Sequence, residues 1–245
     1  MAKEIDLFFG ITLNGTRFKK VIVDGMIGID EEIMADEEYR DSFSRASTAL
    51  LSRCILEVPG YNKLKARPED RIPIDVIQEM YQCDKDMLLM GVFSQAENTL
   101  MKATLTCSCK KKYNFEQDVN ELKLKECDPV EMLDMVLPRG FANETGTYKV
   151  GKLTLPKVKV VEEMDPWIQT NPAKAETVQF WRCLTHMDGD LVVTETRIRR
   201  LSSVDRRYIG RLLSEHTPGQ DMVVKHKCSC GKELTGTWDL SGFFQ

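Results

Sequence analysis

The sequence contains none of the short motifs that mark common enzyme classes. It has no G-x-x-x-x-G-K-[ST] phosphate loop, no G-x-G-x-x-G turn, no H-E-x-x-H pair and no G-x-S-x-G elbow. Histidine is scarce, with three residues in 245, and all three lie in the second half of the chain. These absences exclude the familiar nucleotide-binding, metalloprotease and serine-hydrolase patterns, and we expect a protein that is not an enzyme.

Long hydrophobic runs and an excess of positive charge are also absent. No apolar stretch approaches the roughly 18–20 residues that span a bilayer, and the N-terminal stretch carries acidic residues in place of the apolar core of a secretory signal. The formal charge of −4 and the pI of about 5.6 give no broad basic surface, and the basic run at 197–200 is typical of a solvated helix face. We therefore expect neither a membrane nor nucleic acid as a partner.

The composition is that of a globular protein with unusually many cysteines. The chain is 42% hydrophobic and 29% charged, which is enough apolar material for one large or two small cores. It holds eight cysteines. In a reducing cytoplasm, where we expect the chain to be made, these favour free thiols or metal ligands over disulfides.

Two Cys-Ser-Cys triplets, at 107–109 and 228–230, lie in similar surroundings 121 residues apart. Asp84 and Asp205 each precede their triplet by 23 residues and open a helical pattern, so we expect each to cap the start of a helix. Other matches occur in the same order. They are Arg53-Cys54 with Arg182-Cys183, Gly15 with Gly146, Gly60 with Gly189, and Asp118 with Asp239. The ordered matches predict an internal duplication.

The duplication divides the chain into a first repeat, 1–128, and a second repeat, 129–245. The pattern in each predicts a β-rich start (up to about 29, and again at 152–161), a helix (37–58 in the first repeat), a second helix and a closing hairpin. Each triplet follows the first hairpin strand. The predicted fold class is α+β, an internally duplicated strand–helix–helix–β-hairpin unit with pseudo-two-fold symmetry and hairpins resembling those of zinc ribbons.

The triplets predict half a metal site each, because a zinc site needs four ligands and Cys-x-Cys supplies two thiolates from one turn. If the repeats pack about a two-fold axis, Cys107, Cys109, Cys228 and Cys230 share one structural zinc ion. Alternatively, each half completes its own site. Its further ligands would then come from Cys54, Cys83 and Cys127 in the first half and from Cys183, His216 and His226 in the second. A third reading keeps the cysteines reduced and free of metal.

Two further cysteine features bear on the site. Gly231 follows the second triplet and would free its turn so that N–H groups can approach the sulfur atoms. Cys54 and Cys183 recur at matching helical positions, which is typical of small buried core residues. A thioredoxin-like redox role is disfavoured, because that chemistry uses Cys-x-x-Cys at a helix start.

The C-terminal stretch is rich in aromatic residues. Trp238, Phe243 and Phe244 end an otherwise polar segment, and such side chains often fill pockets on partner proteins. We interpret the three as partner-binding residues. The alternative is that the two phenylalanines fold back onto the core of the same chain.

Several of these segments together resemble a known family. "LLSRCI", "CDKDMLLMGVF" and "LTCSC" in the first half, and "FWRCL", "VDRRYIGRLL", "HKCSCGKEL" and "LSGFF" in the second, resemble the baseplate hub and tail assembly proteins of T4-like contractile-tailed phages. The family pattern is Cys-x-x-Cys-Gly, whereas both pairs here are Cys-x-Cys and Lys110 replaces the first glycine. The opening segment, 11–28, is similar to small tail-assembly chaperones of the tape-measure protein.

The resemblance implies a structural protein of the virion, placed in the viral tail baseplate and made in the host cytoplasm. Its implied partners are other tail proteins, namely hub and tape-measure subunits. Three alternatives stay open. One is an assembly chaperone that leaves before the virion matures, and another is a zinc-ribbon module that binds nucleic acid. The third is a metal-dependent hydrolase, which would need a metal site with an open coordination position.

Overall fold

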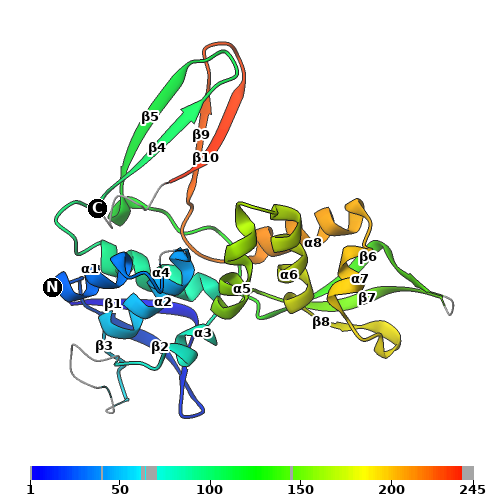
Figure 1. Cartoon of the computed structure of the whole chain (residues 1–245), viewed down its shortest axis with the longest axis horizontal. Helices are drawn as coiled ribbons and strands as arrows, with labels where there is room; N and C mark the ends of the chain where they lie inside the picture. The colour runs from blue at the N-terminus through cyan, green and yellow to red at the C-terminus, as the bar shows by residue number, and fades with distance from the viewer. Residues whose placement is uncertain (1, 40, 62–63, 65–70, 144–145, 239–245) are drawn as a thin grey trace.

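The computed structural model is a mixed α+β structure (Figure 1). It describes residues 2–39, 41–61, 64, 71–143 and 146–238. Two α/β bodies lie next to each other along the long axis of the molecule, and a pair of β-hairpins stands above the first body. Across these described ranges, no helix has both the length and the apolar character needed to cross a membrane.

The first body contains a three-stranded antiparallel sheet in the order β1-β2-β3, covered by helices. The elements of the first half are β1 (Lys3–Leu13), β2 (Thr16–Val23), α1 (Gly28–Ala35), α2 (Phe43–Cys54), β3 (Ile55–Glu57), α3 (Ile74–Gln78), α4 (Gln82–Phe93), β4 (Leu100–Thr106), β5 (Lys112–Asp118) and the 3-10 helix η1 (Val119–Glu121). Strands β4 and β5 form a separate hairpin that leaves this body.

The second body contains the antiparallel sheet β6-β7-β8. The elements of the second half are β6 (Met132–Asn143), β7 (Gly146–Thr154), α5 (Val158–Ile168), α6 (Pro172–Cys183), β8 (Leu184–Met187), the 3-10 helix η2 (Asp188–Asp190), α7 (Glu195–Arg199), α8 (Ser203–His216), β9 (Val223–Lys227) and β10 (Glu233–Thr237). Apart from η1 and η2, the order of helices and strands is the same in both halves. The predicted α+β class is confirmed. The elements β3, α3, β8 and α7, and the first helix of each half, α1 and α5, are additions that the pattern did not predict; α1 begins at Gly28, inside the predicted β-rich start.

Each sheet contains the same irregularity in its first strand. The pairing of β1 with β2 shifts between Asp6 and Ile11, and that of β6 with β7 shifts between Val136 and Phe141. A glycine with positive φ lies in each shift, Gly10 at 96° and Gly140 at 80°. A Cβ atom at either position would approach a backbone oxygen of the neighbouring strand to 2.5 Å or less. Both bulges therefore require glycine.

A buried aspartate holds each bulge. The carboxylate of Asp84 accepts hydrogen bonds from the backbone N–H groups of Phe8, Phe9 and Gly10, at 2.7–3.0 Å. The carboxylate of Asp205 accepts from the N–H of Arg139 at 2.8 Å and, more weakly, from the next N–H along the strand at 3.4 Å. Each bulge thus gives unpaired N–H groups to a carboxylate from a helix of its own half.

The prediction that these aspartates cap helix ends was wrong. Both lie in the first turn, but the capping residues are Tyr81 for α4 and Ser202 for α8. At the start of α8 the Ser202 hydroxyl accepts the N–H of Asp205. The carboxylates are used instead by the bulges, because the strand N–H groups have no partner in the sheet there.

Two predicted element boundaries also differ from the structure. Residues 157–161 were predicted as strand from their alternating valines, but Lys157 is the capping residue of α5, and the helix begins at Val158. Val158 and Val160 are both buried in this helix, so the alternating valines mark two buried helical positions and not one face of a strand. The predicted helix over 37–58 is shorter, since α2 ends at Cys54 and the chain continues directly as β3.

Each half has its own apolar core, and the two cores meet at the boundary between the halves. The core of the first half includes Val158 of α5, and that of the second includes Phe9 and Cys83 from β1 and α4. Cys54 and Cys183 are fully buried, one in each core, so the prediction of two small core residues is confirmed. The two bodies therefore share an apolar contact surface.

A buried lysine lies beside this surface. Nζ of Lys85, in α4, donates to the carbonyl oxygen of Ser44 at 2.7 Å and to Oγ1 of Thr48 at 2.9 Å, both in α2. Thr48 is in turn hydrogen-bonded to Glu162 of α5 at 2.5 Å. Burial lowers the pKa of Lys85 to about 8, against the opposing effect of nearby carboxylates, of which Glu162 is the strongest.

We predict that the free energy of unfolding rises with pH between about 8 and 10.5 because of Lys85. In this range the unfolded chain keeps a proton that the folded chain has released, so a higher pH favours folding. Lys85→Met should lack this rise, which amounts to about 3 kcal/mol. The measurement is denaturant unfolding at several pH values, with the exposed Lys102→Met as the control. Identical pH profiles for the wild type and Lys85→Met would contradict the prediction.

Candidate metal centre

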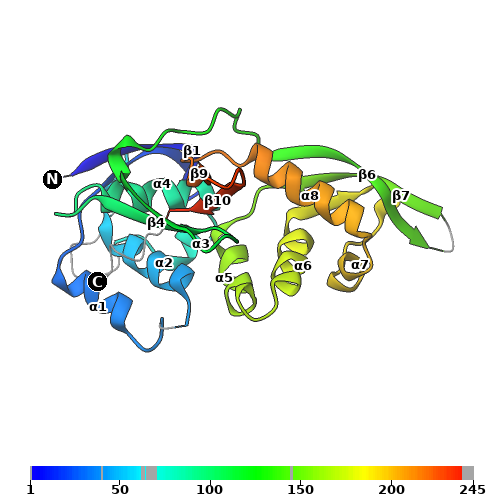
Figure 2. The same cartoon turned by 90° about the horizontal axis from the view of Figure 1, so that it is seen from above.

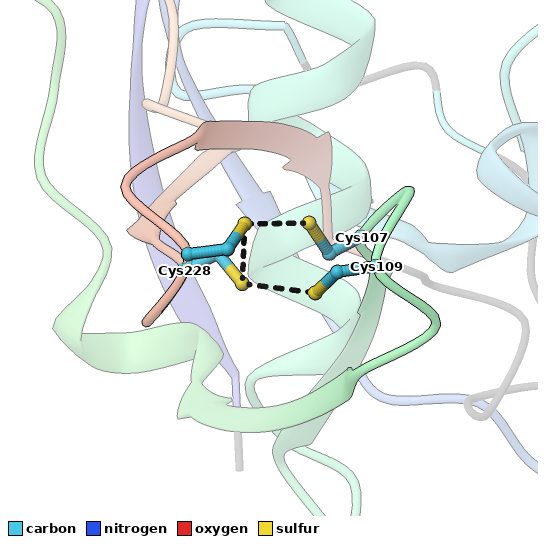
Figure 3. Close-up of side chains that lie close together, drawn as sticks. Cys107, Cys109 and Cys228 are labelled. Carbon is cyan, nitrogen blue, oxygen red and sulfur yellow. Dashed lines mark hydrogen bonds between the residues drawn. The ribbon is translucent and has the colours of Figure 1, made fainter.

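The four cysteines of the two triplets converge at the tips of two β-hairpins (Figure 3). Sγ of Cys107 lies 3.5 Å from Sγ of Cys230, and Sγ of Cys109 lies 3.5 Å from Sγ of Cys228. The sulfur atoms of Cys228 and Cys230 are 3.4 Å apart, and all four lie within 4.8 Å of one another. All four are free thiols.

The same tight turn presents each pair of thiols. The N–H of Cys107 donates to the carbonyl of Lys111 at 2.9 Å, and the N–H of Cys228 donates to that of Lys232 at 2.8 Å. The residue after each second cysteine has positive φ, 68° at Lys110 and 87° at Gly231. The expected role of glycine in the second turn is thus confirmed, and a lysine adopts the same conformation in the first.

The contacts between the two turns are reciprocal. Nζ of Lys111 lies 2.7 Å from Oγ of Ser229, and Nζ of Lys232 lies 2.7 Å from Oγ of Ser108. Replacing each residue of one contact by its counterpart 121 positions away in the other half gives the other contact, and the same holds for the two 3.5 Å sulfur pairs. The two turns are therefore related by a local pseudo-two-fold axis.

The hairpins β4–β5 and β9–β10 enclose only a small apolar cluster. Its buried members are Ala103, Leu105 and Val224, and its half-buried members are Phe115, Leu234 and Trp238. The ring of Tyr113 contacts that of His226 at 4.2 Å between centroids, with the two ring planes tilted by 49°. An isolated two-stranded hairpin is only marginally stable, so we expect the paired hairpins to need a further stabilising interaction.

Hydrogen bonds around the sulfur atoms distinguish the four thiols. The backbone N–H of Cys230 and the hydroxyl of Tyr113, at 3.2 Å, lower the pKa of Cys228 well below its ordinary value. The N–H of Lys111 lowers the pKa of Cys109, but the three neighbouring sulfur atoms together raise it above its ordinary value. Without a cation, the cluster therefore resists the ionisation of all four thiols.

The geometry suits a divalent metal ion with four sulfur ligands. Thiolates at about 2.3 Å from a tetrahedral ion lie about 3.8 Å from one another, close to the separations found here. Such an ion would also offset part of the negative charge that the four thiols acquire on ionising. Cys107 and Cys228 are buried, and Cys109 and Cys230 are exposed. The four cysteines could therefore hold a metal ion between the hairpins.

The structure brings together the four ligands of the shared site and none of the alternative ligands. Cys54, Cys83 and Cys183 are buried in the cores of the two bodies. Cys127 is half-buried outside the cluster, His216 ends α8, and His226 contacts the rings of Tyr113 and Phe115. The model thus favours one site over two.

The aromatic residues predicted to bind partners are described only in part. Trp238 is half-buried, packs against both the first core and the hairpin cluster, and donates its backbone N–H to Met222 at 3.0 Å. Phe243 and Phe244 lie outside the described residues. A role for the three in partner binding stays a prediction.

Three residues of the site were missed from the sequence. Tyr113 donates to the sulfur of Cys228 and accepts the N–H of Ser229, but one aromatic residue in a strand gives no signal of this role. Lys111 and Lys232 could have been found, since the offset that relates the triplets also relates these two lysines. Residues that orient metal ligands in this way contribute to the affinity of a site.

Comparison of the chain with protein-family models, with curated proteins and with solved structures finds no match.

We predict that the purified chain binds one divalent metal ion and that Cys107→Ser and Cys228→Ser each abolish binding, because each variant removes one ligand of a single shared site. Metal content per chain is measured by elemental analysis and native mass spectrometry. The control is Cys127→Ser, which should retain the ion. Loss of the ion in only one of the two ligand variants would contradict a shared site.

Proposed function

We propose that this chain is a non-enzymatic structural component of a bacteriophage tail baseplate whose two halves are clamped by a structural zinc ion. The observation that carries the proposal is the reciprocal convergence of four cysteines from two hairpins far apart in the sequence. Such a site joins distant parts of a chain, which is what a scaffold protein requires.

Zinc is the metal that four thiol ligands favour. Thiolates select soft or borderline ions, and a tetrahedral set of four sulfur atoms is typical of structural zinc. Catalytic zinc sites keep one position open for water, whereas four cysteine ligands fill the tetrahedron. The ligand set therefore supports a structural role for the ion.

An internal duplication is part of the proposal. It is supported by the matching order of elements, by the glycine bulge in the first strand of each half, and by the aspartate that holds each bulge. It is further supported by the paired Cys-Ser-Cys turns with their reciprocal contacts. Under this proposal the chain is one ancestral α+β module present twice, with the hairpins mated about a pseudo-two-fold axis.

The baseplate assignment rests on the sequence resemblance to T4-like hub and tail assembly proteins. The family motifs fall on the end of α2, on the helices α4 and α8, and on the cysteine turns. Hub and tape-measure subunits are the proposed partners, and the virion tail is the proposed location.

Proteomics of phage particles tests this assignment. In particles and isolated tails purified from the phage that encodes the chain, we expect the chain to be present in fixed ratio to the other baseplate proteins. Recovery only from assembly intermediates would replace the structural role by that of a chaperone. Absence from both preparations, or a salt-dependent shift of nucleic acid on gels, would contradict the baseplate proposal.

A further inference from the structure

The second body carries a pocket lined by three arginines. The pocket has a volume of about 460 Å³ and lies beside the bulge of β6, with Arg139, Arg197 and Arg200 in its wall. Its other lining residues are Gly140, Phe141, Ala142, Thr147, Tyr148, Leu191 and Ser202. Among the residues that the structure describes, the lining contains no carboxylate, so its described charged groups are all positive. We call this the arginine pocket.

The nearest buried carboxylate does not neutralise the arginine pocket. Asp205 accepts the backbone N–H groups of the bulge and the hydroxyl of Ser202. One guanidinium nitrogen of Arg197 donates to the carbonyl of Val192. Within the described part of the chain, neither Arg139 nor Arg200 forms an ion pair through its side chain. The described residues thus leave these arginines able to bind an external anion.

The corresponding place in the first body is neutralised within the chain. There a pocket of about 370 Å³ lies beside the bulge glycine Gly10. Its two cations are paired, Arg17 with Glu131 and Lys157 with Glu79 at 2.6 Å. The two bulges thus carry pockets of similar position, of which the first has its cations paired and the second, among the described residues, has an excess of positive charge.

The first body carries the complementary charge at the other end of the molecule. Residues 30–41, from α1 to the start of α2, include seven acidic residues and one arginine. Glu31, Glu32, Glu37 and Glu38 are exposed, and none of them forms an ion pair with a described residue. Figures 1 and 2 place α1 toward one end of the long axis, and α7 with β6 and β7 toward the other. We call residues 30–41 the acidic segment.

We infer that the arginine pocket receives the acidic segment of a second copy of this chain, so that copies associate through unlike ends. The guanidinium groups suit carboxylates, with which they form two-pronged hydrogen bonds. Because the two features lie toward opposite ends of the long axis, they are far apart within one copy. The acidic segment has the charge and the exposure that the arginine pocket requires, so the segment that binds there comes from another copy of the chain.

The association is weak and depends on salt. Exposed ion pairs contribute little individually, and salt screens them beyond about 10 Å at 0.1 M ionic strength. Several pairs that form together in a partly enclosed pocket give more than their isolated values. The association of copies depends neither on the metal site nor on the phage proposal, so a negative result for one does not decide the others.

Charge reversal and complementation test the inference. The pocket variant is Arg139→Glu with Arg200→Glu, and the segment variant is Glu37→Lys with Glu38→Lys. All four side chains are exposed, so both variants should fold. The control reverses two exposed cations elsewhere, Arg211→Glu with Lys102→Glu. Sedimentation velocity of each full chain, and of an equimolar mixture of the two variants, is measured at low and at high salt.

We expect the wild type and the control to associate at low salt and to dissociate at high salt. The pocket variant should remain monomeric, because its pocket and its segment then both carry excess negative charge. The segment variant should associate less than the wild type, because its segment loses two carboxylates and gains two cations. The mixture should associate, since the segment of the pocket variant still fits the arginines of the segment variant. A monomeric wild type at low salt, unchanged association in either variant, or a mixture that stays monomeric would overturn the inference.

Discussion

Four sulfur atoms lie where two β-hairpins meet, and in the proposed account a metal ion bound by them holds the hairpins together. The interface between the hairpins contains three buried apolar residues, and each hairpin has only two strands. A metal ion between the sulfur atoms would close a loop of about 120 residues, which removes much of the conformational freedom of the separated hairpins. The reciprocal lysine–serine contacts align the turns, but they are exposed and contribute little energy alone.

The clamp differs in kind from the contact between the two bodies. The bodies share apolar side chains at their boundary, together with a polar network from Lys85 through Thr48 to Glu162. That surface resists separation without a metal. The hairpins, by contrast, have a small interface and a charged tip. Loss of the ion should therefore loosen the hairpins first and leave the bodies folded, which places the dependence on metal in one part of the molecule.

Much of this organisation could be predicted from the sequence, because matching residues recur in the same order in the two halves of the chain. The two matching triplets predicted the pairing of the hairpins and the four ligands of one site. The matching helical positions of Cys54 and Cys183, together with the usual burial of free cysteine, predicted their place in the cores. The aspartates were found but misread, because the N–H groups that they bind lie about 70 residues away in a strand whose bulge has no pattern of its own. Residues 157–161 were misread because alternating valines also fit a helix buried on several sides. The role of Tyr113 depends on the approach of the other hairpin, which no local pattern contains.

The central claim is that one ion holds both hairpins at once. Hydrogen–deuterium exchange of the full chain with and without a metal chelator measures it most directly, since exchange reports local opening segment by segment. The account predicts that metal removal accelerates exchange in β4–β5 and in β9–β10 together, while β1, β2 and α2 remain as protected as before. Acceleration confined to one hairpin, or no change in either, would contradict a clamp shared between the two halves.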